Sequence, residues 1–267
     1  MNELQKTQLS ILQEFIKVCE TLNLKYFLVC GSCLGAVKYK GFIPWDDDVD
    51  VALVRDDYEK FISKAPNLLP DYLFLQNYKS EKQVPFLYSK IRDSRTTFIE
   101  KSTEKLVINH GVYIDVFPLD GYPDKGRRLF EFRKNKYKLQ TICAYENNVK
   151  LTTALFLKVE RLLGYHLRTY QINRRLEKLL KKNSTEHSEL WCNFGNWQGK
   201  LEYAPKSQYG EGVAAMFEGI EVIIPEKYDE YLTQKYGDWR SDLDEDKKRS
   251  HHNVLICDLN KSYTNHY

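Results

Sequence analysis

The sequence has no long run of apolar residues. A transmembrane helix takes roughly 18 or more of them in succession, and no stretch approaches that length. The N-terminus also lacks the basic region followed by an apolar run that is typical of a secretory signal. Apolar residues instead recur at helical spacing through residues 1–22, which predicts an amphipathic helix. We therefore expect a cytoplasmic protein.

The sequence also lacks a disulfide framework, because its six cysteines are scattered along the chain. Cys30 and Cys33 form one C-x-x-C pair, but a four-cysteine zinc site would need a second pair. We interpret these two residues as buried or pocket-wall thiols, with a redox or zinc site as the alternative.

Net charge is small, at +3, but it is unevenly distributed. Residues 125–182 hold sixteen basic and four acidic residues, so the rest of the chain is net acidic. This basic segment has no proline and predicts two or three helices. Apolar positions among its charges favour peripheral contact with an anionic membrane surface, although the apolar stripe can also pack on the core. We expect no nucleic-acid partner, because no recognised binding motif accompanies the charge.

The order of the remaining elements indicates an α/β (α+β) fold. Clusters of β-forming residues predict strands at 25–31, 48–54, 72–78, 85–93, 96–100, 111–121 and 220–225. Helical spacing and stop signals predict helices at 32–41, 55–65 and 226–237. Residues 191–212 are rich in aromatic residues and glycine, which predicts a loop region.

Four carboxylates crowd into GFIPWDDDVDV, residues 41–51. Side chains alternate faces on an extended chain, so Asp46, Asp48 and Asp50 are expected to point one way and Asp47 the other. Like charges this close repel unless a cation lies between them. We therefore predict a divalent cation at Asp48 and Asp50. Asp46 is left open between a metal contact and a cap of the preceding turn.

Asp115 is a single acid between Ile114 and Val116 on a predicted strand. A carboxylate in such apolar surroundings needs a partner, and a metal shared with Asp48 and Asp50 would supply one. Magnesium takes carboxylates together with substrate phosphates, so Mg²⁺ or Mn²⁺ is the expected ion.

Two further pairs suit a phosphate ligand. Gly31 and Ser32 stand at a predicted strand–helix junction, where helix N–H groups can bind phosphate, although such pairs are often plain turns. Lys90 and Arg92 are two apart on a predicted strand and would place two cations on one face. A solvated strand face is the alternative for that second pair.

The Gly-Ser pair, the D-x-D and the lone strand acid together resemble the nucleotidyltransferase superfold. The longer stretch YFLVCGSCLGAVKYKGFIPWDDDVDVAL closely resembles the signature of the LicD family, apart from Cys33, where many members have another residue. Three later blocks, FLYSKIRDSRTTFI, GVYIDVFPLDG and FEGIEVIIPEKYDEYLTQKYGDW, also resemble that family. The resemblance covers residues 10–125 and 200–252.

The resemblance implies a nucleotidyltransferase-like mixed sheet with flanking helices and a basic helical insert. It implies a catalytic core at residues 1–124, the insert at 125–190, and a part at 191–267 that completes the catalytic domain. The family moves a phospho-alcohol from a CDP-activated donor to a glycan hydroxyl. CDP-choline is the expected donor, and a lipid-linked teichoic acid or lipopolysaccharide precursor is the expected acceptor, reached by the protein at the inner face of the membrane.

The same resemblance assigns roles to residues. Asp48, Asp50 and Asp115 are expected to hold the metal and carry catalysis, with Asp115 as third ligand or as base. The residues expected to bind substrate are Gly31, Ser32, Trp45, Lys90 and Arg92.

Several alternatives stay open. The donor can carry ribitol, glycerol or ethanolamine phosphate instead, or the enzyme can transfer NMP to a small-molecule hydroxyl. A non-enzymatic binding module would leave the acid triad unexplained. Roles in the site for His251 and His252 are undecided. Four aromatic residues are interpreted either as a cage for a quaternary ammonium group or as core: Trp45, Trp197, Tyr203 and Tyr209.

Overall fold

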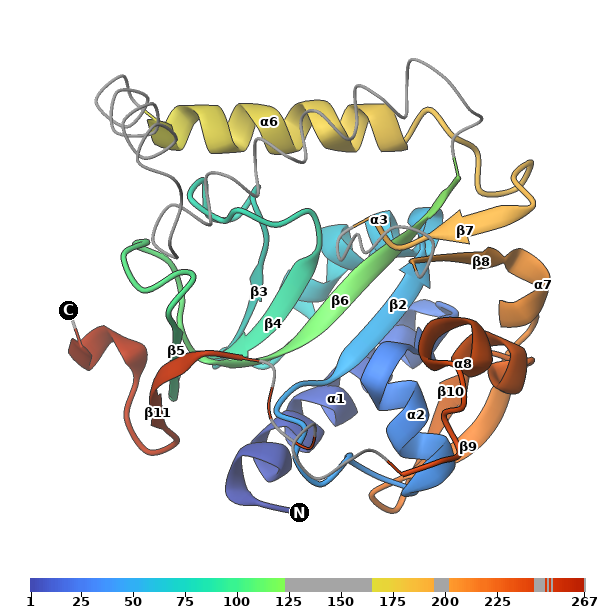
Figure 1. Ribbon diagram of the computed structural model, residues 1–267. Coiled ribbons are helices and arrows are strands. Elements are labelled where there is room, and N and C mark those ends of the chain that lie inside the picture. Colours follow the sequence, from blue (N-terminus) through green and yellow to red (C-terminus); the bar gives the residue numbers. More distant parts are fainter. Residues whose placement is uncertain (123–164, 195–201, 243–247, 249, 251, 267) are drawn as a thin grey trace, which may run out of the picture.

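The computed structural model describes residues 1–122, 165–194, 202–242, 248, 250 and 252–266. Within them the chain forms a mixed sheet with helices on both faces, which confirms the α/β class (Figure 1). The helices expected in the basic segment before residue 165 lie outside the described residues. No helix of the described ranges is long and apolar enough to span a bilayer.

The main sheet is built around β6, a ten-residue strand whose residues are all buried. β6 runs parallel to β2 on one side and antiparallel to β4 on the other, and β7 pairs with its last residues. The order is β1-β2-β6-β4-β3, with β8 paired to β7. The strands are β1 (Tyr26–Leu28), β2 (Asp50–Val54), β3 (Leu73–Gln76), β4 (Ser89–Asp93), β6 (Val112–Gly121), β7 (Leu190–Cys192) and β8 (Tyr203–Pro205).

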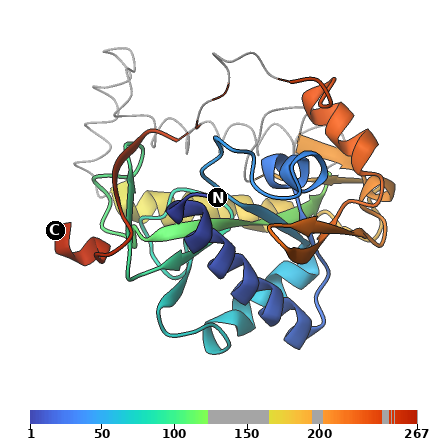
Figure 2. The same cartoon turned by 90° about the horizontal axis from the view of Figure 1, so that it is seen from below.

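Helices cover both faces of this sheet (Figure 2). α1 (Glu3–Leu22) and α3 (Arg55–Lys64) pack on one face, and α2 (Cys30–Lys38) and α8 (Tyr228–Tyr236) lie on the other. α6 (Tyr165–Leu180) runs along one end of the sheet (Figure 1).

The N-terminal helix shows why these residues fold locally as they do. Asn2 and Gln5 form a capping box, in which each side chain accepts the backbone N–H of the other. Ile11, Leu12 and Phe15 are fully buried on the sheet side, and each contributes about 1.5–3 kcal/mol of hydrophobic stabilisation. The predicted amphipathic helix is therefore confirmed.

Shorter elements complete the described chain. β5 pairs with β11, and β9 with β10, in two separate ribbons. Their bounds are β5 (Thr97–Glu100), β9 (Val213–Phe217), β10 (Ile220–Ile224) and β11 (Val254–Asp258), with short helices α7 (Lys206–Tyr209), η1 (Ala65–Asn67) and η5 (Tyr263–His266).

Most of the predicted elements are confirmed, but several boundaries differ, and the difference at residues 30 and 31 affects the site. Residues 30 and 31 were expected to end the first strand, and they instead begin α2. Cys30 adopts a left-handed φ of 51°, which turns the chain from β1 directly into the helix. Cys30 and Cys33 are both free and buried, as interpreted from the sequence. The loop region expected at 191–212 contains the end of β7 and all of β8 and α7.

Candidate active site

A cleft of about 560 Å³ lies between the acidic loop, α2 and α8. Asp46, Asp48 and Asp50 all line it, whereas Asp47 is turned away from it and is buried. The predicted alternation is therefore confirmed, although only Asp50 belongs to a strand. A cleft of this size is typical of small-molecule binding sites.

The acidic loop is held in place from two sides. On α1, the side-chain amides of Gln5 and Gln8 donate to the backbone carbonyls of Asp46 and Asp47, at 3.1 and 2.6 Å. On α2, the hydroxyl oxygen of Ser32 accepts the backbone N–H of Asp50 at 2.8 Å. These buried hydrogen bonds fix the backbone, so the carboxylates stay close together despite their repulsion.

Strand pairing brings the remaining predicted acid beside the loop. Asp115 on β6 is in register with Asp50 on β2, and with Lys90 on the other neighbour, β4. The Lys90 ammonium lies 2.7 Å from the Asp115 carboxylate, and both side chains are buried. It also lies 3.3 Å from the centre of the Tyr113 ring. Lys90 therefore neutralises Asp115.

Burial and mutual repulsion disfavour the charged forms of these acids. Burial and the neighbouring Asp47 raise the pKa of Asp46 to about 6, and burial and Asp46 raise that of Asp48 to about 8. The pKa of Asp50 rises for the same reasons, with Asp48 and Asp115 as its charged neighbours. Burial also raises the pKa of Asp115, and Lys90 limits the rise. A cluster of this kind gains stability from any added cation.

The donor set fits a divalent cation in its chemistry. Asp50, which is buried, and Asp48, which is half-buried, supply carboxylate oxygens, which are the ligands Mg²⁺ prefers. In the part of the chain that the structure describes, no three His, Cys, Asp or Glu side chains are grouped as a ready metal site. Mg²⁺ is usually held by one or two carboxylates together with substrate phosphates, so two protein ligands suffice.

His252 reaches the same site from the C-terminal segment. Its Nδ1 lies 2.8 Å from the Asp47 carboxylate, and Ser250 donates to that carboxylate as well. Its Nε2 lies 3.9 Å from Asp48 and 3.7 Å from Glu100. Burial alone would lower the pKa of His252, but these three acids raise it to about 9. His252 is thus a second cation at the edge of the cluster, whereas His251 lies outside the described residues.

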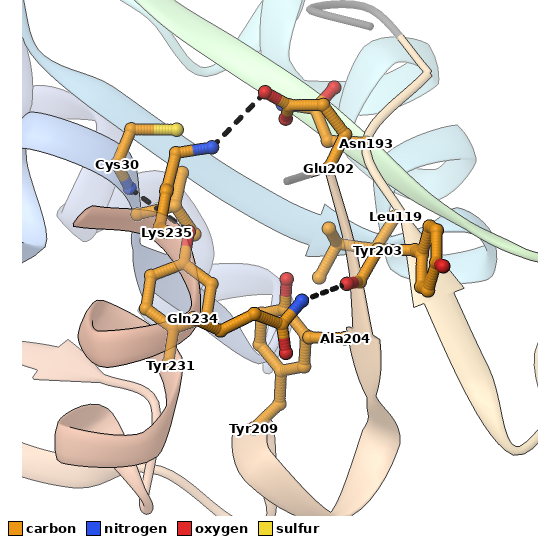
Figure 3. A pocket seen from close by; sticks show the side chains of 11 residues that line it. Cys30, Leu119, Asn193, Glu202, Tyr203, Ala204, Tyr209, Tyr231, Gln234 and Lys235 are labelled. Carbon is orange, nitrogen blue, oxygen red and sulfur yellow. Dashed lines mark hydrogen bonds and ion pairs between the residues drawn. The ribbon is translucent and has the colours of Figure 1, made fainter. Parts of the chain in front are cut away.

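A smaller pocket adjoins the cleft on the side of α8 (Figure 3). Lys235 lines both cavities and pairs with the buried Glu202 at 3.1 Å. The Tyr231 hydroxyl accepts the backbone N–H of Cys30 at 3.1 Å, which anchors the start of α2 against α8. Burial alone would lower the pKa of Lys235, but Cys30 and Glu202 raise it, so its charge is retained.

Comparison with known proteins identifies this arrangement. The family model described as "LicD/FKTN/FKRP, nucleotidyltransferase domain" matches residues 23–159, about half of the chain. The chain belongs to the LicD family. The matched segment includes α2, the acidic loop, β4 and β6. It therefore contains all the residues that were predicted to form the site.

Individual relatives of this LicD-family chain cover different shares of it. A lipopolysaccharide cholinephosphotransferase of Haemophilus influenzae, LicD, is 29% identical over 94% of this chain and 96% of its own length. An uncharacterized protein of Rickettsia typhi is 29% identical over 50% of this chain and 41% of its own. A second, from Rickettsia prowazekii, is 46% identical over 13% of each chain.

The predicted phosphate-binding residues of this LicD-family chain are not all in the cleft. Gly31 lines it, and a Cβ there would lie 2.7 Å from an Asp46 carboxylate oxygen, so a side chain at this position would require the Asp46 carboxylate to move. The Ser32 hydroxyl is buried on the Asp50 backbone, so its position supports the loop. Lys90 is bound to Asp115. Arg92 is fully buried away from the cleft.

Arg92 serves the interior of the sheet. Its guanidinium donates to the Gln76 side chain at 2.5 Å and to the Gly111 carbonyl at 2.7 Å. It also packs 4.6 Å from the Tyr113 ring centre. Arg92 lies on the same face of β4 as Lys90, as the sequence predicted. At Arg92, two residues further along the strand, this face packs against the core and not against the cleft.

The aromatic residues proposed for a cage are dispersed. Trp45 lines the cleft, as expected for a substrate-binding residue. Tyr209 is buried against Phe27 and Tyr231, and Tyr203 contacts Tyr122. Trp197 lies outside the described residues. Tyr209 belongs to the core, so the interpretation of these four residues as a cage is wrong for Tyr209.

Sequence reasoning missed two residues that line the cleft and one buried acid near it. Lys235 and Tyr236 come from a block whose likeness to the LicD family was evident, but no local pattern distinguishes them. Glu100 is buried beside Tyr113, whose hydroxyl donates to it at 2.9 Å. In the sequence, Glu100 is the last residue of a predicted strand, and no local pattern marks it as part of a site.

Proposed function

We propose that this LicD-family chain transfers phosphocholine from CDP-choline to a hydroxyl of a lipid-linked cell-surface glycan, a teichoic acid or lipopolysaccharide precursor, and releases CMP. The observation that carries the proposal is the gathering of Asp46, Asp48 and Asp50 in one cleft. The near full-length match to a cholinephosphotransferase supports the choice of transferred group and acceptor. An acid cluster in a cleft suits a reaction whose donor is a pyrophosphate, because a divalent cation held by these acids would offset the negative charge of the donor.

We assign Mg²⁺ or Mn²⁺ to Asp48 and Asp50, with Asp115 as a third ligand or as base. When bound, the ion neutralises the pyrophosphate and stabilises the leaving CMP. Asp46 adjoins this pair and is near Gly31, so it closes the site on the side of α2.

The chain's own groups bind and orient the donor. Gly31 lies in the first turn of α2, where backbone N–H groups point toward a phosphate and the helix dipole favours negative charge. Lys235 adds a retained positive charge on the facing wall. Because Gly31 has no Cβ, the Asp46 carboxylate can pack directly against the first turn of α2.

The acceptor hydroxyl must lose a proton as it attacks phosphorus. Asp115 is proposed to take it, since Lys90 at 2.7 Å keeps this buried carboxyl ionised more readily than Asp48 or Asp50. General-base assistance of this kind is worth about 10²–10⁴ in rate.

α6 is the described part of the basic segment, and we propose that it helps the protein to contact an anionic membrane surface. Arg174, Arg175 and Lys178 are exposed on it, whereas Leu176 and Leu180 are buried against Cys192 and Phe194. The described apolar positions thus pack on the core, and the charges remain free to attract lipid headgroups.

A donor screen tests the proposed function. Purified protein is incubated with a membrane glycolipid acceptor, Mg²⁺ and one of CDP-choline, CDP-ribitol, CDP-glycerol or CDP-ethanolamine. CMP release that is highest with CDP-choline supports the proposal. Preference for another donor reassigns the alcohol, and pyrophosphate release from a nucleoside triphosphate instead points to NMP transfer.

A further inference from the structure

Four aromatic side chains, here called the aromatic wall, line the cleft that holds the acids. Tyr39 follows the last residue of α2, and Trp45 immediately precedes the acidic run. Tyr236 ends α8, and Trp239 follows it on the next turn. Two segments that lie about 190 residues apart in the sequence thus supply rings to the same cleft.

The rings of this wall are arranged to accept positive charge. Tyr39 and Trp45 pack edge to face, with ring centres 6.2 Å apart and planes at 80°. The Lys38 ammonium lies 5.9 Å from the Tyr39 ring centre, and the Lys248 ammonium lies 5.5 Å from that of Trp45. Distances near 6 Å or less are those of cation–π contacts.

These rings also remain accessible. Tyr236 is 42% exposed, and Tyr39, Trp45 and Trp239 are half-buried. The large aromatic residues of the core, such as Phe15 and Phe27, are instead fully buried. Exposed aromatic surface gathered inside a concave site is characteristic of ligand recognition.

The charges around the wall favour a cation. Asp46 and Asp238 line the cleft with the rings, in addition to the two acids assigned to the metal. Lys38, Lys235 and His252 also line the cleft. Asp242 pairs with Lys38 at 3.0 Å, Glu202 with Lys235 at 3.1 Å and Asp47 with His252 at 2.8 Å, so each of these cations already has an acidic partner.

We propose that this aromatic wall binds the trimethylammonium group of the donor. A quaternary ammonium ion has no N–H to donate, so ring faces and nearby carboxylates are the groups that recognise it. This assignment rests on the proposed function and adds a selectivity site to it. It separates choline from alcohols such as ribitol and glycerol, which carry hydroxyls and no charge.

The position of the wall suits the length of the donor. Trp45 is three residues from Asp48, so their Cα atoms are at most about 11 Å apart. Tyr236 directly follows Lys235, the cation assigned to the phosphates. A choline nitrogen, two carbons from its phosphate ester oxygen, can thus rest on the rings while the phosphate is held at the acids.

Calorimetry with a neutral isostere tests the proposal. CDP-choline is compared with the CDP ester of 3,3-dimethylbutanol, in which carbon replaces the charged nitrogen without a change of shape. Binding is measured without acceptor, and CMP serves as the reference ligand. The wild-type protein is expected to bind CDP-choline about tenfold more tightly than the isostere.

Variants locate the effect. Trp45→Leu and Tyr236→Leu are expected to lose this preference while their affinity for CMP is kept. Tyr72→Leu is the matched control, because the Tyr72 ring also carries a cation, Arg95 at 3.6 Å, but lies outside the cleft. Tyr236 is exposed, so its removal leaves the core intact even where a Trp45 variant fails to fold.

The outcomes distinguish this proposal from the one on which it rests. Tight CDP-choline binding with no preference over the isostere, or a preference that survives both leucine variants, overturns the aromatic site and leaves the proposed function standing. Binding of CDP-choline no tighter than CMP, with no CMP release in the donor screen, overturns both. A preference lost in both variants and kept in Tyr72→Leu supports the aromatic site.

Discussion

The Lys90 ammonium lies 2.7 Å from the Asp115 carboxylate, and both side chains are almost entirely shielded from solvent. Their strands are in register at these two residues, so the pair is fixed by the sheet itself. Asp115 therefore has a protein counter-ion, whereas the side chains of Asp48 and Asp50 face a cleft. The two kinds of acid should respond differently to substitution and to metal ions.

Replacing the cleft acids should abolish transfer. Asp48→Asn or Asp50→Asn removes a charge from the proposed metal site but relieves repulsion, so the fold is expected to be retained or stabilised. CMP release and circular dichroism measure the two effects. EDTA should remove activity reversibly, and full activity in EDTA would end the metal assignment.

Replacing Asp115 should slow the reaction. Asp115→Asn is expected to lower turnover by about 10² or more, because it removes the proposed base or ligand. Steady-state kinetics with CDP-choline measure the loss. Asp93→Asn serves as a control for a buried acid on the neighbouring strand, which pairs with Arg95 and has no proposed role in the reaction. Near-normal turnover of the Asp115 variant would reduce this residue to a structural role.

The Lys90–Asp115 pair should also be visible in stability. Lys90→Gln leaves a buried carboxylate without its counter-ion, which typically costs about 3–5 kcal/mol. The double variant Lys90→Gln/Asp115→Asn removes both charges and is expected to recover much of that loss. Urea unfolding of the three variants and wild type gives the coupling energy. Additive effects of the two substitutions would contradict a direct interaction.

Stability without metal should fall as pH rises. The pKa of Asp48 is about 8 in the folded protein, while an unfolded aspartate titrates near about 4, so the native state binds the extra proton. The associated stability is complete below about pH 4 and is lost as pH rises toward about 8. The raised pKa of His252, about 9, adds to the loss between about pH 6.5 and 9.

Magnesium should oppose this loss where the acids are ionised. Mg²⁺ is expected to raise the Tm more at about pH 8 than at about pH 5, since protons occupy the site at the lower pH. Thermal unfolding of wild type and Asp48→Asn/Asp50→Asn makes the comparison. An equal Mg²⁺ effect in the double variant would place the ion elsewhere.

The exposed arginines of α6 should promote membrane contact. Arg174→Glu/Arg175→Glu is expected to weaken salt-sensitive sedimentation with anionic liposomes, since each basic residue near such a surface contributes about 1 kcal/mol. Lys17→Glu/Lys64→Glu makes the same charge change on α1 and α3 and is the control. A wild-type protein that ignores anionic liposomes at low salt would refute the membrane role.

The acidic loop was predictable because extended backbone alternates its side chains even outside a strand. Asp46, Asp48 and Asp50 could therefore be assigned to one side from the sequence alone. The strands around them could also be predicted, since runs of β-branched residues between turn signals are typical of strands. The substrate-binding role expected for Arg92 was wrong because alternation predicts only the face on which a side chain lies. It does not predict which part of that face lines the cleft and which part packs in the core.

Contacts distant in the sequence were not predictable. His252 pairs with Asp47 across 205 residues of sequence. Lys235 belongs to α8, which comes much later in the chain than α2 and the acidic loop. Neither residue has a local pattern that indicates a partner. Their placement depends on packing of the whole domain, which no window of the sequence contains.

The hydrogen bond between Asp47 and His252 can form only late in the synthesis of the chain. Translation proceeds at roughly 5–20 residues per second, so about 10–40 s separate the synthesis of the acidic loop from that of its histidine. During this interval the nascent loop carries its carboxylates without that partner. The enzyme thus completes its charge arrangement only late in its own production, after the ribosome has passed the sheet and α8.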